Sequence, residues 1–249
     1  MKKIILACVT TILSLSFIHA QKNAEAVIMA ENLGEEEEAP LELRPILLGV
    51  TAGVNMTTYS GDRDPKMGLG GQIGINCDIP VSENFSIMPE LIFAYKTVDV
   101  NQVKENEYLE VVAMKSTDKL LYMNVPVNVK WSTHVGNGRP FIAAGPMLNV
   151  GLYGENKADD GSKLLLFQSD SNGELAYRER PIYNILGFSV NLKAGYDFDF
   201  GLSITAACEL GLTNMYKLND ERKLYFEEEL GMKTSQKSMS FSLSLGYNF

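Results

Sequence analysis

The side chains that most often carry catalysis or bind metals are scarce in this sequence. Only two histidines occur, His19 and His134, together with three cysteines. A Ser-His-Asp arrangement needs an imidazole within hydrogen-bonding distance of a hydroxyl and a carboxylate, and a zinc site needs clustered histidines and cysteines. The isolated residues here match neither pattern. We therefore predict a protein that is not an enzyme and that has no catalytic residue, cofactor or metal ion.

The stretch GLGGQIG at residues 68–74 has the composition of a phosphate-binding loop but not its spacing. A dinucleotide fingerprint requires a sixth-position glycine, where this stretch has Ile73, and a helix that follows. No helical pattern follows. We interpret the stretch as the glycine-rich interior of a β-strand.

Charged residues of both signs, Lys96 among them, stand on the small, polar face of segments with a period of two, and four of these residues are predicted to interact. These four are Glu90, Lys130, Lys193 and Glu209. A lone buried charge is costly, whereas a hydrogen-bonded pair is tolerated, so we expect these residues to form a mixed-charge network inside a closed sheet. We expect Lys193 to approach a carboxylate, with Glu209 on the adjacent strand as its predicted partner.

The elements that position these charges are strands, as the last segment SMSFSLSLGYNF illustrates. Large apolar and small polar residues alternate in it without a break, as they do on the two faces of a β-strand. The same alternation occurs in eight segments of the chain. These are residues 46–57, 69–79, 85–96, 120–131, 141–153, 186–198, 202–213 and 238–249.

The connections between these segments alternate in length. Short turns follow the second, fourth and sixth segments, whereas long loops occupy residues 58–67, about 99–116, 154–182 and 217–236. An even number of strands with short turns at one end and long loops at the other is typical of transmembrane barrels. The sequence therefore predicts an all-β protein, an eight-stranded antiparallel up-and-down transmembrane β-barrel.

The residue types indicate which face meets lipid. The polar face is rich in Gly, Ser, Asn, Thr and Ala, which suit a crowded lumen better than the charged surface of a soluble barrel. Aromatic residues near strand ends on the apolar face predict a membrane-interface girdle, with scattered core aromatics as the alternative. The predicted girdle consists of Tyr95, Trp131, Tyr196, Tyr247 and Phe249. Cys77 and Cys208 fall on the same apolar face, on strands that are not neighbours, so we expect free thiols.

The N-terminus has the composition of a secretory signal peptide. A basic start precedes an apolar run that is short for a membrane span, which predicts a signal peptide at residues 1–20. Residues 21–45 form an acidic, flexible leader, and residues 46–249 form the barrel. The run Glu35 to Glu38 lacks the alternating ligands of a calcium loop, so we interpret it as a solvated charge run.

The charge of the chain argues against a nucleic-acid partner. Without Lys2 and Lys3, the predicted mature chain has 20 basic and 31 acidic residues, a net charge of −11. Such a chain has no basic footprint for nucleic acid. No mature segment is long and apolar enough to predict a transmembrane helix.

Several motifs resemble the PorT-like outer-membrane β-barrel family of Gram-negative bacteria, often labelled the porin family. They are LLYMNVPVNVKW, RPFIAAGPMLNVGL, the Gly-Tyr-Asp of LKAGYDFDFG, and the terminal LSLGYNF. The resemblance covers residues 46–249 and implies an eight-stranded barrel in the outer membrane. The terminal Phe249 and Tyr247 also resemble the signal by which the barrel-assembly machinery recognises a last strand. The resemblance implies no single activity.

The third long loop carries a hairpin signal. Asn172 and Gly173 supply the positive φ angles of a tight turn, and the flanking segments with Leu165, Phe167 and Tyr177 are strand-like. We expect residues 163–178 to form a hairpin that pairs with another protein's strand. The alternative is a hairpin that only extends the barrel strands and packs its apolar residues on neighbouring loops.

Our leading functional hypothesis is a non-enzymatic integral outer-membrane protein that acts through its extracellular loops or as a structural or assembly component. Its expected partners are outer-membrane lipid, the barrel-assembly machinery and a protein at the long loops. The first alternative is a passive channel for small solutes, although eight strands enclose only enough room for side chains. The second alternative is a secreted soluble barrel that binds an apolar ligand.

Overall fold

The computed structural model describes residues 43–60, 66–105, 111–158, 161, 163–167, 182–217 and 235–249. Within them lie eight long strands and three short ones. The long strands are β1 (Leu47–Ser60), β2 (Lys66–Pro80), β3 (Phe85–Glu105), β4 (Val111–Ser132), β5 (Gly138–Ala158), β8 (Leu186–Phe198), β9 (Leu202–Gly211) and β11 (Lys237–Asn248). The short strands are β6 (Lys163–Leu165), β7 (Ile182–Tyr183) and β10 (Tyr216–Lys217).

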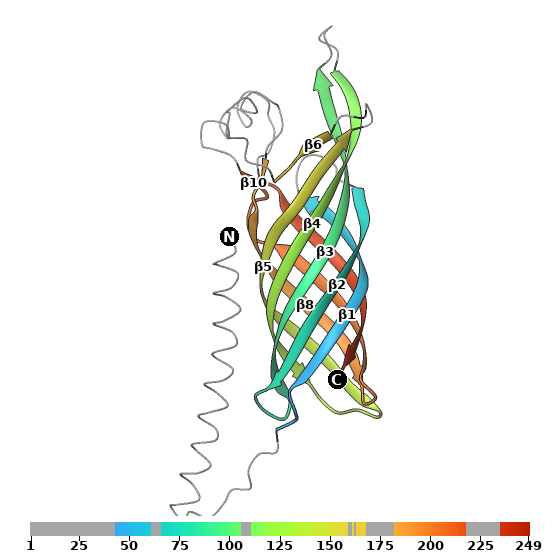
Figure 1. Cartoon of the computed structure of the whole chain (residues 1–249), viewed down its shortest axis with the longest axis vertical. Helices are drawn as coiled ribbons and strands as arrows, with labels where there is room; N and C mark the ends of the chain where they lie inside the picture. The colour runs from blue at the N-terminus through green and yellow to red at the C-terminus, as the bar shows by residue number, and fades with distance from the viewer. Residues whose placement is uncertain are drawn as a thin grey trace, which may run out of the picture. The chain divides into compact units, whose positions relative to one another are not determined.

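The eight long strands close into a barrel (Figure 1). Each strand pairs antiparallel with its neighbour in the chain, and β11 pairs with β1, where Val50 lies opposite Tyr247. Among the long strands, β5 pairs with β4 on one side and with β8 on the other. The predicted eight-stranded antiparallel barrel is confirmed. The described residues contain no helix of the length and hydropathy needed to cross a membrane.

Short turns gather at one end of the barrel, shown at the lower end of Figure 1. They span residues 81–84, 133–137 and 199–201, between the strand pairs β2–β3, β4–β5 and β8–β9. Gly136 and Gly201 have φ angles of 67° and 96°, which non-glycine residues rarely adopt. The described strand ends that border the other connections all lie at the opposite end, as the alternation of loop lengths predicted.

Three strands, β3, β4 and β5, are much longer than the sequence pattern predicted. β3 continues to Glu105 and β4 starts at Val111, so most of the predicted loop at residues 99–116 is paired strand. The segment is rich in β-branched residues, including Val98, Val100 and Val103, which favour extended backbone even without a clear period of two. The resulting β3–β4 hairpin rises beyond the other strands in Figure 1.

The two faces of the wall are as different as predicted. Outward positions carry exposed apolar side chains, such as Leu69, Ile73 and Leu245, whereas the lumen holds buried polar ones, such as Asn128 and Asn191. A soluble barrel would show the opposite arrangement, because the hydrophobic effect drives large apolar side chains inward in water. The alternative of a secreted soluble barrel is therefore wrong. Cys77 and Cys208 are free thiols, as expected.

Candidate functional site

The lumen contains ion pairs at three heights along the barrel axis. The level nearest the short-turn end, which we call the lowest, surrounds Lys130. Its Nζ lies 2.6 Å from Asp78 Oδ2 on β2 and 2.7 Å from Asp197 Oδ2 on β8, and 4.7 Å from the centre of the Phe141 ring. Lys130 and Asp78 are fully buried. The ammonium group therefore joins three strands of the wall at the short-turn end.

The middle level joins Lys193 on β8 to Glu90 on β3. Lys193 Nζ lies 2.6 Å from both carboxylate oxygens, and Asn128 donates a further hydrogen bond of 2.8 Å to Glu90 Oε1. The predicted pairing of Lys193 with Glu209 is wrong. The register places Glu209 opposite Asn191, two residue pairs away from Lys193, and the lysine side chain instead crosses the lumen to a strand that is not its neighbour.

The upper level joins Lys96 on β3 to Glu209 on β9. Their Nζ and Oε2 atoms are 2.5 Å apart, and Glu209 also accepts hydrogen bonds from Asn149 and Ser189. Lys96 Nζ lies 5.4 Å from the centre of the Tyr122 ring. All four residues of the predicted network thus lie in the lumen. Their ion-pair partners include three residues that were not predicted to take part, Lys96, Asp78 and Asp197. The alternation already put these three residues on the polar face, so the signal that could have found them is the same period of two.

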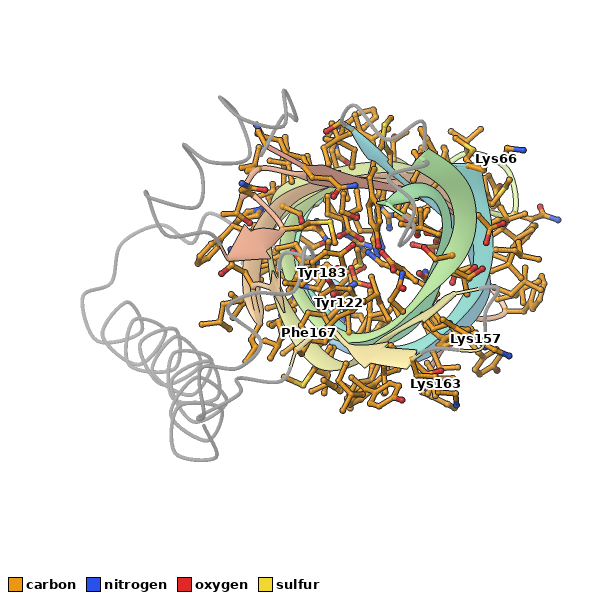
Figure 2. All side chains as sticks on the ribbon, turned by 90° about the horizontal axis from the view of Figure 1, so that it is seen from above. Lys66, Tyr122, Lys157, Lys163, Phe167 and Tyr183 are labelled. Atoms are coloured by element: carbon orange, nitrogen blue, oxygen red, sulfur yellow. The ribbon has the colours of Figure 1, made fainter. Side chains whose placement is uncertain are left out.

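An apolar cluster fills the lumen above these levels. We call it the mouth cluster: Tyr59, Val98, Leu120, Tyr122, Leu166, Phe167, Tyr183 and Met215. The Phe167 ring meets Tyr122 edge-on at 5.5 Å and Tyr183 at 6.3 Å. A Cβ atom on Gly151 would lie 2.6 Å from the Phe167 ring, so this glycine leaves the space that the ring occupies. Figure 2 shows Tyr122 and Tyr183 inside the ring of strands.

The described part of the third long loop folds back rather than forming the first arm of a free hairpin. β6 pairs with β5, with Leu165 opposite Glu155, after a turn in which Gly161 has a φ of 82°. Leu165 is 43% exposed, whereas Leu166 is 4% exposed and Phe167 belongs to the mouth cluster. The sequence signal for this turn is Asp160-Gly161, which the more prominent Asn-Gly pair obscured. The predicted hairpin residues Asn172, Gly173 and Tyr177 lie outside the described residues.

A buried carboxylate anchors this folded-back segment. Asp118 on β4 accepts hydrogen bonds of 2.5 Å from the Tyr183 hydroxyl on β7 and from Asn156 Nδ2 on β5. Asp118 and Asn156 are both 2% exposed. The loop segment that carries Tyr183 is thereby tied to the inner wall of the barrel.

Two arginines lie at the opposite, short-turn end. Arg44 precedes β1, and burial followed by the neighbouring charge of Arg139 lowers the pKa of its guanidinium. Arg139 donates a hydrogen bond of 3.3 Å to the backbone carbonyl of Glu83. Arg44 is one of the last residues of the predicted leader, and its guanidinium lies within electrostatic range of Asp78 and Asp197.

The predicted girdle residues occupy two heights on the wall. Trp131 lies opposite Phe85, and Tyr196, Tyr247 and Phe249 lie at the same short-turn end. Tyr95 lies near the other end, ten residues above Phe85 on β3. At about 3.3 Å per residue and a strand tilt of about 40°, this separation is about 25 Å along the barrel axis, the height of the apolar band of transmembrane barrels.

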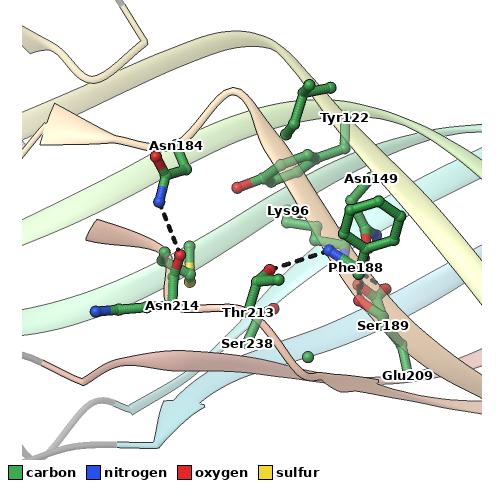
Figure 3. Close-up of a pocket in the computed structure, with 14 residues that line it drawn as sticks. Lys96, Tyr122, Asn149, Asn184, Phe188, Ser189, Glu209, Thr213, Asn214 and Ser238 are labelled. Carbon is green, nitrogen blue, oxygen red and sulfur yellow. Dashed lines mark hydrogen bonds and ion pairs between the residues drawn. The ribbon is translucent and has the colours of Figure 1, made fainter. Parts of the chain in front are cut away.

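Two cavities remain in the lumen. The upper one, of about 30 Å³, lies between the Lys96–Glu209 pair and the mouth cluster. Figure 3 shows its polar lining, in which Asn184 donates to the backbone carbonyl of Asn214 at 3.0 Å. The lower one, of about 40 Å³, is bordered by the Glu90–Lys193 pair and by hydroxyl and amide side chains of β1, β2, β9 and β11. The lining of the upper cavity also includes apolar side chains such as Phe188 and Met215, and the charges that border both cavities are paired.

The geometry for acid–base chemistry is poor within the described residues. His134 Nε2 lies 3.6 Å from Asp199 Oδ1 in the short turns, where both side chains are more than half exposed. A triad would also require a nucleophilic hydroxyl bonded to the imidazole. No group of three or more His, Cys, Asp or Glu side chains is placed to hold a metal ion in the part of the chain that the structure describes.

Comparison with known proteins identifies the family. A family model described as "Outer membrane protein beta-barrel domain" matches residues 20–217. Among solved structures, Ail of Yersinia pestis is 12% identical, with 83% of this chain and 100% of that chain covered and a TM-score of 0.39. OprG of Pseudomonas aeruginosa is also 12% identical, with coverage of 83% and 97% and a TM-score of 0.45. The outer-membrane enzyme PagL is 13% identical, with coverage of 80% and 98% and a TM-score of 0.41.

No curated protein sequence matches the chain significantly. The family model covers well over half of the chain, and it agrees with the closed wall and the apolar outer face. The barrel is therefore located in the outer membrane, and the chain belongs to the family of the outer membrane protein β-barrel domain.

Proposed function

We propose that this protein is a sealed, non-enzymatic barrel that acts through the elements it presents outside the membrane. The observation that carries this proposal is the filled lumen, with ion pairs at three levels and the mouth cluster above them. An eight-stranded wall encloses only enough room for side chains, and each charge in these pairs is held by an opposite charge on another strand. Both features oppose the free passage of solutes.

The element best suited to bind a partner is the β3–β4 hairpin. Residues 100–105 of β3 lie beyond the last pair with β2, Lys66 and Asp99. Residues 111–115 of β4 lie beyond the last pair with β5, Ser116 and Ala158. Within the described residues, these two segments pair only with each other. An extended strand of a partner protein can add to such an edge through backbone hydrogen bonds.

Two finer assignments belong to this proposal. The motifs within β4, β5, β8 and β11 support a PorT-like member of the family. The position of Phe249 supports recognition of β11 by the barrel-assembly machinery, because its side chain is 70% exposed at the very end of the wall.

A passive channel is the second candidate, and the two lumen cavities are the observation in its favour. Planar-bilayer recordings of the purified protein separate the candidates. We expect no stable single-channel current from the natural protein, and none from Leu166→Ala/Phe167→Ala, because the ion pairs below the truncated mouth cluster still fill the lumen. Stable currents of porin size from the natural protein would overturn the sealed barrel.

The partner-binding role has a separate test. Replacement of residues 101–115 by Asn-Gly joins Val100 to Ser116 through a two-residue turn and removes both free edges. The variant should keep the heat-modifiable gel shift of a folded barrel and lose the proteins that co-purify with the natural chain from detergent-solubilised membranes. Retention of every co-purifying protein by the folded variant would assign partner binding, if any, to another element.

A further inference from the structure

Three prolines lie within the wall of the barrel on three consecutive strands. They are Pro89 on β3, Pro126 on β4 and Pro146 on β5, and we call them the proline seam. Proline has no backbone N–H to donate to a ladder, so in sheets it is normally confined to edge strands, strand ends or bulges. A closed wall has no edge strand. Each of these prolines therefore removes a ladder hydrogen bond from the interior of the wall.

Strand pairing is interrupted at each proline. In the described strands, the β2–β3 ladder omits residues 88–89 of β3, the β3–β4 ladder omits residues 125–126 of β4, and the β4–β5 ladder omits residues 145–146 of β5. The register is the same on both sides of each gap, so bonds are lost without the inserted residue of a bulge. The other five pairs of neighbouring long strands are continuous over their described lengths. The weak pairing is therefore confined to one side of the barrel.

The missing N–H groups point into the interrupted interfaces. Ser132 on β4 donates its N–H to the carbonyl of Asn84, directly before β3. Alternate residues of a strand direct their backbone groups to the same neighbour, so Pro126 also faces β3. At the next interface, a Cβ atom on Gly145 would collide with the carbonyl oxygen of Val127. Glycine thus leaves room for a carbonyl to which Pro146 offers no donor.

Side chains in the lumen connect the strands across these gaps. Asn128 on β4 donates a hydrogen bond of 2.8 Å to Glu90 on β3, and its Oδ1 accepts one of 3.3 Å from Asn191 on β8. Lys193 on β8 binds the same Glu90 at 2.6 Å. We call these four residues the luminal bridge. It joins β3 to β4 and both of them to β8, which lies beyond the interrupted β4–β5 interface.

The lower cavity gives water access to the seam from the inside. Its lining includes Met88, Glu90 and Ile92 of β3, on both sides of the β2–β3 and β3–β4 gaps. A volume of about 40 Å³ with polar walls is sufficient for water. Backbone groups that separate at the seam can therefore be hydrated from the lumen, although the outer face meets lipid.

We propose that the proline seam is a hinge in the wall and that the luminal bridge holds it closed. Opening of the hinge separates β3, β4 and β5 locally, while the five continuous interfaces keep the barrel intact. The parts of β3 and β4 above the hinge carry the β3–β4 hairpin. The inference does not depend on whether that hairpin binds a partner or whether the lumen conducts. Departures from local sequence rules, such as prolines in the interior of a wall, are expected at functional elements.

Hydrogen–deuterium exchange of the full-length protein in detergent, followed by mass spectrometry, tests the proposal. Asn128→Leu keeps the size of the side chain and removes both amide hydrogen bonds of the luminal bridge. Backbone amides in residues 87–92, 123–129 and 142–147 should then exchange about tenfold faster than in the natural protein, because local opening costs less. Exchange in residues 202–210 of β9 and 239–247 of β11 should not change. The heat-modifiable gel shift establishes that the variant is folded.

Asn124→Leu is the matched control. Asn124 is another buried amide of β4, and it accepts a hydrogen bond of 3.0 Å from Asn149, its direct partner in a continuous part of the ladder. The loss of that bond should leave exchange at the seam unchanged. Equal acceleration by the two asparagine variants would overturn the proposal, as would acceleration in β9 and β11 equal to that at the seam, which indicates global destabilisation.

Pro146→Val tests the hinge from the opposite direction. Pro146 is exposed on the outer face, so valine restores an N–H without changing the packing of the lumen. Exchange in residues 124–129 and 142–147 should become slower, and Asn128→Leu/Pro146→Val should exchange more slowly there than Asn128→Leu. The single proline variant decides the question even if Asn128→Leu does not fold. Unchanged exchange after this repair would show that the seam is not a hinge.

Discussion

Replacement of Lys193 by methionine tests the energetic role of the lumen network. The change removes an ammonium group with two contacts of 2.6 Å to Glu90 and keeps most of the apolar side chain. The side chains of Lys193 and Glu90 are 9% and 3% exposed, so the carboxylate left behind is shielded from bulk water. Glu90 keeps a single hydrogen bond, from Asn128.

Removing one partner of a buried pair costs about 3–5 kcal/mol. The remaining bond from Asn128 places Lys193→Met near the lower end, at about 3 kcal/mol, which corresponds to a fall of about 6–12 °C in the melting temperature of a domain of this size. Lys157→Met, at an exposed position, should change stability by no more than about 0.5 kcal/mol. The assay is the temperature at which the folded band disappears in the heat-modifiable gel shift, together with urea unfolding in detergent.

The double variant Lys193→Met/Glu90→Met distinguishes the energy of the ion pair from the effects of the other contacts that these two side chains make. Because it removes both charges, it should regain most of the stability that Lys193→Met loses, which appears as a large coupling energy in the double-mutant cycle. Equal melting temperatures for Lys193→Met and Lys157→Met would refute the buried network. A double variant that is less stable than either single variant would show that the two side chains stabilise the barrel through other contacts.

Three further variants or treatments have defined outcomes. Tyr183→Phe removes the hydroxyl that binds buried Asp118 and should lower stability by about 1–3 kcal/mol in the same gel-shift assay, because the carboxylate loses a partner. Deletion of Phe249 should reduce the fraction of chains that reach the folded, heat-modifiable form in cells, whereas refolding of the purified protein into detergent should be little affected. In membranes, Cys77 and Cys208 should react with an apolar maleimide but not with a charged one, because both lie on the lipid side of the wall; equal labelling by the charged reagent would contradict that orientation.

The sequence by itself determined the strands and the direction in which each side chain points. A period of two assigns alternate residues to opposite faces, and small polar residues on one face with large apolar ones on the other are enough to identify a lumen and a lipid surface. The placement of Glu90, Lys130, Lys193 and Glu209 in the interior follows from this alternation alone. The lengths of the connections determined the up-and-down order of the strands and the end at which the long loops lie.

Only the tertiary structure decided which inward residues meet. Alternation specifies a face but not a height, and the height depends on the stagger of strands around a closed wall. Lys193 therefore reaches Glu90 across the lumen, while Glu209 on the neighbouring strand pairs with Lys96. The same holds for the folded-back loop, because Phe167 packs against Tyr122 only where Gly151 leaves room for its ring. Such contacts join residues that are far apart in the chain, and no local pattern encodes the distance between them.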